Sequence, residues 1–196
     1  MSNKNKVNKT TRSGSGQPLS SLRIIGGCHR SRVIRFPALP GVRPTPDRVR
    51  ETLFNWLGQD LTGMTTLEPY AGTGVLSLEA LSRGARWCVA WDTQKPLVQA
   101  LGQTAALLGE EGRLEVRCAE AVAALRQETR VFDVIFLDPP FDDDPWPQLF
   151  EACAARLKPG GWLYAEAGHP VIPSTFFELS RQGRAGQVYF HLFCRV

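Results

Sequence analysis

The feature that most constrains this chain is a repeat of short apolar run, glycine-containing turn and helical stretch. From residue 64 onward, the runs MTTL, WCVAW, LEVRC, FDVIFL and GWLYAEA alternate with expected helices at 75–83, 95–108, 120–128 and 146–157. This alternation predicts parallel strands joined by crossover helices in an open sheet. The last run, FFELSRQGRAGQVYFHLFCRV, contains two strand-like segments around a short turn. It predicts an antiparallel hairpin that closes the sheet.

Length and composition favour one compact domain with short appendages. The chain has 196 residues, of which 43% are hydrophobic, so it has enough apolar material for a single core. No segment has the long apolar run of a membrane span or a secretory signal. The five cysteines never form C-x-x-C, and the histidines are scattered. We therefore expect a cytoplasmic protein with no membrane partner, no disulfide framework and no bound metal.

Charge is distributed unevenly along the chain. Residues 1–57 carry a formal charge of +9, whereas residues 58–196 carry −5. A basic N-terminal part suits a polyanion such as nucleic acid, although a solubilising tail with a solvated arginine-rich face explains the charge equally well. The candidate phosphate contacts are Arg30, Arg32, Arg35, Arg43 and Arg48.

Three segments follow from these patterns. Residues 1–21 are polar, basic and rich in Gly and Ser, and we expect a disordered tail. Residues 22–58 predict a small β-hairpin, a Pro-rich loop and a helix, with Asp47 as the N-terminal cap of that helix. Residues 59–196 form the main sheet domain.

Ligands of open parallel sheets bind at the carboxyl ends of the strands, so the residues after each run are the candidate site. Glu68 and the glycines Gly72 and Gly74 follow the first strand of the repeat. Glycine allows a tight turn and a close approach of the backbone to a ligand. Ser77 stands where a dinucleotide fingerprint has its third glycine, which disfavours a pyrophosphate cofactor. The alternative is a plain strand-to-helix turn.

Acidic residues follow the next two strands as well. Asp92 is placed to accept hydrogen bonds from ribose hydroxyls, and Glu120 from an adenine amino group. Each has a structural alternative, because acidic residues are also favoured at helix N-termini.

The most specific motif is Asp138-Pro139-Pro140-Phe141, directly after FDVIFL. The prolines have no N–H, so the loop offers a carboxylate and carbonyl acceptors without competing backbone donors. Such a loop suits an amino group on an aromatic base, with Phe141 available to stack on that base. An ordinary Pro-Pro turn is the alternative.

Taken together, the order E-x-x-x-G-x-G, Asp, Glu, D-P-P-F resembles the class I S-adenosylmethionine-dependent methyltransferases. The segments LRIIGGCHRSRVIRF, RPTPDRVRETLFNWL and GTGVLSLEALSRGA are similar to the bacterial guanine-N2 methyltransferases of 16S rRNA, and the likeness covers about residues 22–196. It implies a Rossmann-like α/β fold whose seven-stranded sheet is mostly parallel, with an antiparallel C-terminal hairpin and a small N-terminal extension. The chain departs from the family at Glu68-Pro69-Tyr70, where Asp-Leu-Phe is usual, at Gln94, where a second acid is common, and at Glu120, a frequent Asp.

The resemblance implies transfer of a methyl group from S-adenosylmethionine to the N2 amine of a guanine in 16S rRNA, presented by the small ribosomal subunit to a monomeric enzyme. Catalysis falls to Asp138, Pro139, Pro140 and Phe141. The implied cofactor-binding residues are Glu68, Tyr70, Ala71, Gly72, Gly74, Asp92, Glu120 and Ala121. Whether Asp138 acts as a base or only orients the amine stays open.

Three alternatives remain at this point. An adenine-N6 nucleic-acid methyltransferase uses the same acceptor loop, usually with Asn in place of Asp138. A dehydrogenase shares the sheet but is disfavoured by Ser77. A non-catalytic RNA-binding factor in ribosome assembly explains the basic N-terminal segment equally well.

Overall fold

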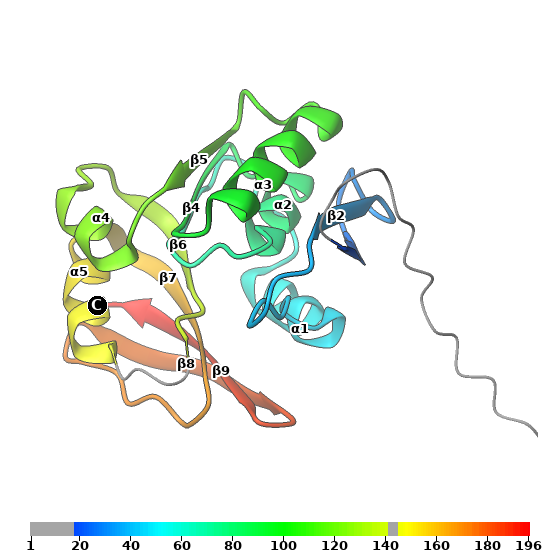
Figure 1. Ribbon diagram of the computed structural model, residues 1–196. Coiled ribbons are helices and arrows are strands. Elements are labelled where there is room, and N and C mark those ends of the chain that lie inside the picture. The colour runs from blue at the N-terminus through cyan, green and yellow to red at the C-terminus, as the bar shows by residue number, and fades with distance from the viewer. Residues whose placement is uncertain (1–17, 141–144) are drawn as a thin grey trace, which may run out of the picture.

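A mostly parallel seven-stranded sheet with helices on both faces forms the body of the protein (Figure 1). The computed structural model describes residues 18–140 and 145–196. The strands of the large sheet are β3 (Thr65–Glu68), β4 (Trp87–Asp92), β5 (Leu114–Cys118), β6 (Phe132–Leu137), β7 (Leu157–Ala167), β8 (Phe177–Ala185) and β9 (Val188–Arg195). Their order is β5-β4-β3-β6-β7-β9-β8, and β9 runs antiparallel to both neighbours. The predicted fold class is confirmed.

Helices cover the two faces of this sheet in separate groups. They are α1 (Asp47–Leu57), α2 (Val75–Ser82), α3 (Lys95–Leu108), α4 (Ala121–Gln127) and α5 (Trp146–Ala154). The first three pack with one apolar cluster and the last two with another (Figure 1). Alternate residues of β6 supply the two clusters, because successive side chains of a strand point to opposite faces. Val134 and Phe136 face the α1 side, while Ile135 and Leu137 face the α5 side.

The N-terminal extension is a separate two-stranded sheet followed by α1. Strand β1 (Leu19–Arg23) pairs antiparallel with β2 (Val33–Pro37). The first strand begins before residue 22, the expected start of the hairpin, because Leu19 to Ser21 continue the pairing with β2. Residues 1–17 of the predicted tail lie outside the described residues.

Apart from shifts of one residue in α2 and α4, two predictions about helix ends are wrong. Asp47 does not cap α1, because it is the first helical residue and its carboxylate instead pairs with Arg50. Helix α5 ends at Ala154, before the expected residue 157, because Leu157 already pairs with Phe132 of β6 and begins β7. Among the described residues, no helix combines the length and apolar character that crossing a bilayer requires.

Candidate active site

The strand order changes direction between β3 and β6, and this is where the candidate site lies. From β3 the chain continues through α2 to β4 on one side, whereas from β6 it continues through α5 to β7 on the other. Loops that leave two neighbouring strands in opposite directions open a crevice at their carboxyl ends. The sequence motifs around Glu68 and Asp138 follow these two strands.

Three carboxylates gather on one face of the sheet at this edge. Glu68 ends β3, Asp138 follows β6, and Glu166 lies near the end of β7. The pairing of Phe136 with Tyr164 places Asp138 level with Glu166 on neighbouring strands, and level residues point to the same face. This face is the one that α1 and α2 cover. The edge therefore gathers three acidic side chains toward the N-terminal extension.

Glu68 is buried and joins β3 to the start of α2. One oxygen of its carboxylate accepts hydrogen bonds from the backbone N–H of Ser77 at 2.9 Å and from the Ser77 hydroxyl. Ser77, which stands where a dinucleotide fingerprint has its third glycine, thus holds the Glu68 carboxylate in place. Burial raises the pKa of Glu68 from 4.5 to about 7, and the hydrogen bonds from Ser77 oppose this rise without cancelling it.

This raised pKa predicts a pH-dependent stability. Between about pH 4.5 and 7 the folded protein holds the Glu68 proton that the unfolded chain has released, so stability falls as pH rises. Glutamine does not titrate, so we expect the free energy of unfolding of Glu68→Gln to fall by about 3 kcal/mol less than that of the wild type between pH 4.5 and 8. Urea unfolding at both pH values measures the slope, with exposed Glu111→Gln as control. A Glu68→Gln slope equal to that of the wild type contradicts the assignment.

Asp138 stands at the centre of the three carboxylates. Burial, the neighbouring Glu166 and then Glu68 raise the pKa of Asp138 well above its ordinary value. Within residues 18–140 and 145–196, no hydrogen-bond donor is directed at its carboxylate. Pro139 is buried beside it and Pro140 is exposed, whereas Phe141 lies outside the described residues. The described part of the loop consists of a carboxyl group and two prolines without N–H.

Glu166 and its partners were not predicted from the sequence. An oxygen of its buried carboxylate accepts hydrogen bonds from the hydroxyls of Thr45 at 2.9 Å and Tyr164 at 3.0 Å. Burial raises the pKa of Glu166, and these two hydrogen bonds oppose the rise. The available signal was the acid inside GWLYAEA, at a strand end like the others. Thr45 belongs to the Pro-rich loop, so this contact ties the N-terminal extension to the site.

The glycine loop after β3 is tied to the end of β4. Asp92 accepts hydrogen bonds from the backbone N–H of Gly72 at 2.7 Å and of Gln94 at 2.8 Å. Gly72 and Gly74 both have positive φ, of 51° and 69°. A Cβ on Gly72 meets open space, whereas one on Gly74 collides with Leu101. Gly72 therefore leaves room for a ligand above the loop, and Gly74 permits close packing of α3.

The remaining cofactor candidates lie along the same edge. Glu120 caps α4, accepting from the N–H groups of Val122 at 2.9 Å and Ala123 at 2.7 Å, so the structural alternative for this residue is realised. A carboxylate has about four acceptor positions, which leaves capacity for a ligand. Ala121 is buried in the first turn of α4. Ala71 is buried, and its N–H donates to the backbone carbonyl of Trp91 at 2.8 Å. Tyr70, the preceding residue, is half-buried.

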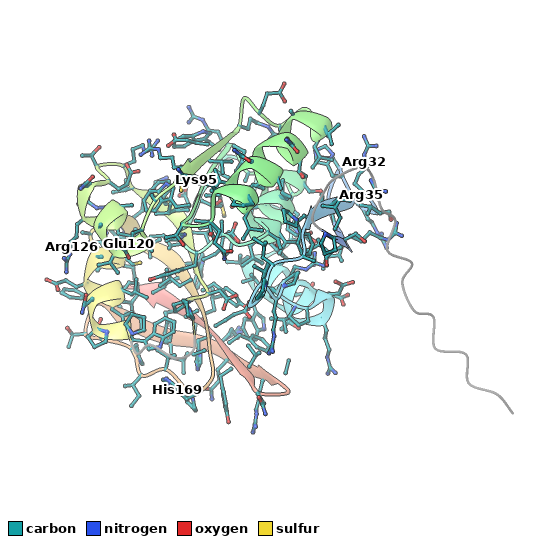
Figure 2. The ribbon with its side chains drawn as sticks, in the orientation of Figure 1. Arg32, Arg35, Lys95, Glu120, Arg126 and His169 are labelled. Atoms are coloured by element: carbon teal, nitrogen blue, oxygen red, sulfur yellow. The ribbon has the colours of Figure 1, made fainter. Side chains whose placement is uncertain are left out.

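The structure separates the five candidate arginines into two groups, although all are exposed. Arg30 and Arg32 lie around the hairpin turn, whose backbone N–H groups donate to Ser82 at the end of α2. Because α2 leads back from the carboxyl end of β3, its end and the hairpin turn lie at the amino-end edge of the sheet. Arg35 lies on β2, and Figure 2 shows it with Arg32 at the outer side of the N-terminal hairpin. Arg43 and Arg48 flank Thr45 and so lie near Glu166.

The fold also brings together Cys28, His29 and Glu110, whose potential ligand atoms lie within 4.8 Å of one another. His29 Nε2 already contacts the Glu110 carboxylate at 2.6 Å, and Arg113 pairs with the same carboxylate. The contacts join the hairpin turn to the end of α3 through residues far apart in sequence, which is why no sequence spacing revealed them. The guanidinium beside Glu110 disfavours a cation here.

Comparisons with known proteins agree with this arrangement. A family model described as "Conserved hypothetical protein 95" matches residues 22–194. The chain is 38% identical over 199 aligned residues to Ribosomal RNA small subunit methyltransferase D of Escherichia coli strain K12, with 96% of each chain covered. Two solved structures are also similar. A proposed methyltransferase from Escherichia coli has a TM-score of 0.81 at 34% identity, covering 90% of this chain and 98% of its own.

The second structure, a proposed methylase from Haemophilus influenzae, has a TM-score of 0.77 at 30% identity, covering 90% of this chain and 99% of its own. The resemblance inferred from the motifs is confirmed. Nearly the whole chain is matched, and the range includes the loops of the site and all of the N-terminal hairpin except the first three residues of β1. The chain therefore belongs to the family described as Conserved hypothetical protein 95.

Proposed function

We propose that this protein methylates small-subunit ribosomal RNA, transferring a methyl group from S-adenosylmethionine to the exocyclic N2 amine of a guanine. The observation that carries the proposal is the acceptor loop at Asp138 and Pro139, beside the crevice between β3 and β6. It occurs in a chain 38% identical, over 96% of its length, to an rRNA small subunit methyltransferase.

The acceptor loop solves the main chemical difficulty of this reaction. The lone pair of guanine N2 is delocalised into the ring, so the amine is a poor nucleophile until its hydrogens are held. The Asp138 carboxylate and the Pro139 carbonyl accept the two hydrogens and turn the nitrogen toward the methyl donor. Such positioning contributes about 7–11 kcal/mol in well-oriented systems, so it is sufficient as the main catalytic effect.

The cofactor residues fit a sulfonium ligand better than a pyrophosphate. The carboxyl groups of the buried Glu68 and Glu166 and the half-buried Asp138 gather at this edge. A cationic ligand favours their ionised forms, whereas a phosphate is repelled by them. We assign Gly72 and Gly74 to the backbone approach, Asp92 to the ribose hydroxyls, Glu120 and Ala121 to the adenine, and Glu68, Tyr70 and Ala71 to the methionine side. When bound, S-adenosylmethionine supplies a methyl group on positively charged sulfur, which needs no further activation.

Asp138 also takes the proton that N2 loses after methyl transfer. Burial, and then the neighbouring carboxylates, raise the pKa of Asp138, and a carboxylate with a raised pKa is a stronger base. Pro140 shapes the same turn, and we assign Phe141 to stacking on the guanine. Because the loop reaches only an unstacked base, the guanine must be flipped out or lie in a single-stranded region.

The RNA backbone is held by Arg43 and Arg48 near the site, with Arg30, Arg32 and Arg35 contacting more distant parts of the small subunit. All five side chains are exposed and can release counterions from phosphates. We propose that the protein acts as a monomer in the cytoplasm and needs no metal.

Labelled S-adenosylmethionine and small subunits from cells lacking this enzyme provide the direct test. We expect label in one guanine of 16S rRNA, identified as N2-methylguanine by mass spectrometry of the digested RNA. Label in adenine instead supports the adenine-N6 alternative. RNA binding without any transfer supports a non-catalytic assembly factor and overturns the proposal.

A further inference from the structure

The hairpin formed by β8 and β9 places an arginine–tyrosine pair at the carboxyl-end edge of the sheet, on the face opposite the three carboxylates. Arg184 and Tyr189 are opposite one another in the two strands, and the guanidinium carbon of Arg184 lies 4.8 Å from the centre of the Tyr189 ring. Arg184 Nε also donates to the Gly186 carbonyl at 2.9 Å, which holds the guanidinium in place over the ring. Arg184 is exposed and Tyr189 is half-buried.

The register of the sheet places this pair at the carboxyl-end edge. Tyr189 is opposite Ala167, and Phe190 is opposite Glu166, the acid level with Asp138. Because successive side chains alternate, Tyr189 and Arg184 point to the α5 face, whereas Phe190 and Glu166 point to the α1 face. The tip of the hairpin therefore begins where β7 ends, and Figure 1 shows it extending beyond the rest of the sheet, next to α1. Trp56 in the last turn of α1 packs against Phe190, with ring centroids 5.3 Å apart and the rings tilted by 31°. This contact fixes the tip relative to the helix that carries Arg48.

The charges around this edge complement a nucleic acid. The carboxylates inside the site repel phosphates, so the strand that carries a flipped base must be held by cations at the rim. Arg43 and Arg48 provide cations on the side of Thr45, and Arg184 provides one on the side of the hairpin. An arginine stacked on an aromatic ring forms a flat cationic surface that accepts both a phosphate and a base face.

We propose that Arg184 and Tyr189 form a contact surface for single-stranded RNA next to the target nucleotide. The inference rests on the proposed function for the identity of the RNA, while the surface itself is defined by the hairpin. Arg184 binds the backbone or stacks on a neighbouring base, and Tyr189 supports the guanidinium from below. The pair lies apart from the acceptor loop and takes no part in the methyl transfer itself.

The test compares Arg184→Ala with Arg126→Ala, an equal loss of charge on the exposed last turn of α4. We expect Arg184→Ala to raise KM for small subunits about five- to tenfold while kcat stays within about twofold. Its affinity for a short single-stranded RNA oligonucleotide falls, and the slope of log affinity against log salt decreases by about one. Arg126→Ala changes neither quantity. Tyr189→Phe keeps the ring and binds RNA like the wild type, whereas Tyr189→Ser weakens binding.

Urea unfolding of each variant separates this role from simple bracing of the hairpin. If Arg184→Ala lowers stability but leaves KM and the salt slope unchanged, the pair is structural and the proposal is wrong. The oligonucleotide measurement needs no methyl transfer, so it distinguishes failure of this surface from failure of the proposed activity. A wild-type protein that binds RNA through Arg184 but methylates adenine refutes the guanine assignment alone.

Discussion

Replacing Asp138 by alanine is expected to lower the turnover of methyl transfer by about 10²–10⁴-fold, the range for loss of a positioned acid–base group. The substitution removes an acceptor for the N2 hydrogens together with the site that receives the proton. S-adenosylmethionine binding is expected to stay intact, because Asp92 holds the glycine loop through the Gly72 N–H and is itself oriented by the Gln94 N–H, and neither contact involves Asp138. Single-turnover assays with saturating methyl donor measure the change, and Glu111→Ala, an exposed acid, is the control.

Asp138→Asn separates the two roles of this side chain. The carboxamide oxygen still accepts one N2 hydrogen, so part of the turnover lost in the alanine variant returns. The wild-type rate is expected to rise with pH as Asp138 ionises, because burial and the nearby carboxylates keep it protonated above its ordinary range. That rise disappears in the asparagine variant. Turnover of Asp138→Ala close to that of the wild type excludes the acceptor mechanism altogether.

Replacing Glu79 by alanine is expected to cost about 3–5 kcal/mol of folding stability. Glu79 is fully buried in α2, and its carboxylate pairs with the guanidinium groups of Arg50 and Arg83, which are buried as well. It also accepts the backbone N–H of Ile25 at 2.8 Å, and Arg50 donates to the carbonyls of Arg23 and Thr45. Removing the acid leaves the buried Arg83 without a counter-charge and the buried Arg50 with only the exposed Asp47.

Urea unfolding at neutral pH measures this loss, with Glu51→Ala, an exposed acid of α1, expected to change stability by less than about 0.5 kcal/mol. Because Glu79 joins α1 and the hairpin to the main sheet, we expect its loss to loosen the N-terminal extension first. Faster amide exchange in β1 and α1 than in β6 reports this order. If Glu79→Ala and the wild type have the same free energy of unfolding, the ion network makes no net contribution to stability, because its desolvation cost cancels its attraction.

The ion network shows where reading the sequence reached its limit. Pairing of Arg50 with a neighbouring acid on its own helix is a local expectation, and the Asp47 contact agrees with it. Its pairing with Glu79, by contrast, joins residues 29 positions apart and depends on how α1 packs on α2. The same holds for Thr45 and Glu166, which are 121 positions apart.

The sequence by itself determined the order of strands and helices, the parallel sheet with its antiparallel ending, and the acidic and glycine positions at the strand ends. These features depend on hydrophobic periodicity and on glycine and proline, whose backbone preferences shape only the few residues around them. Only the tertiary structure decided that Glu68, Asp138 and Glu166 share one face, and that Arg30 and Arg32 lie at the opposite edge from Arg43 and Arg48. It also decided that Arg184 and Tyr189 lie together at the carboxyl-end edge, on the other face of the sheet. Such juxtapositions depend on strand register and helix packing, which are set by contacts between distant segments rather than by any local pattern.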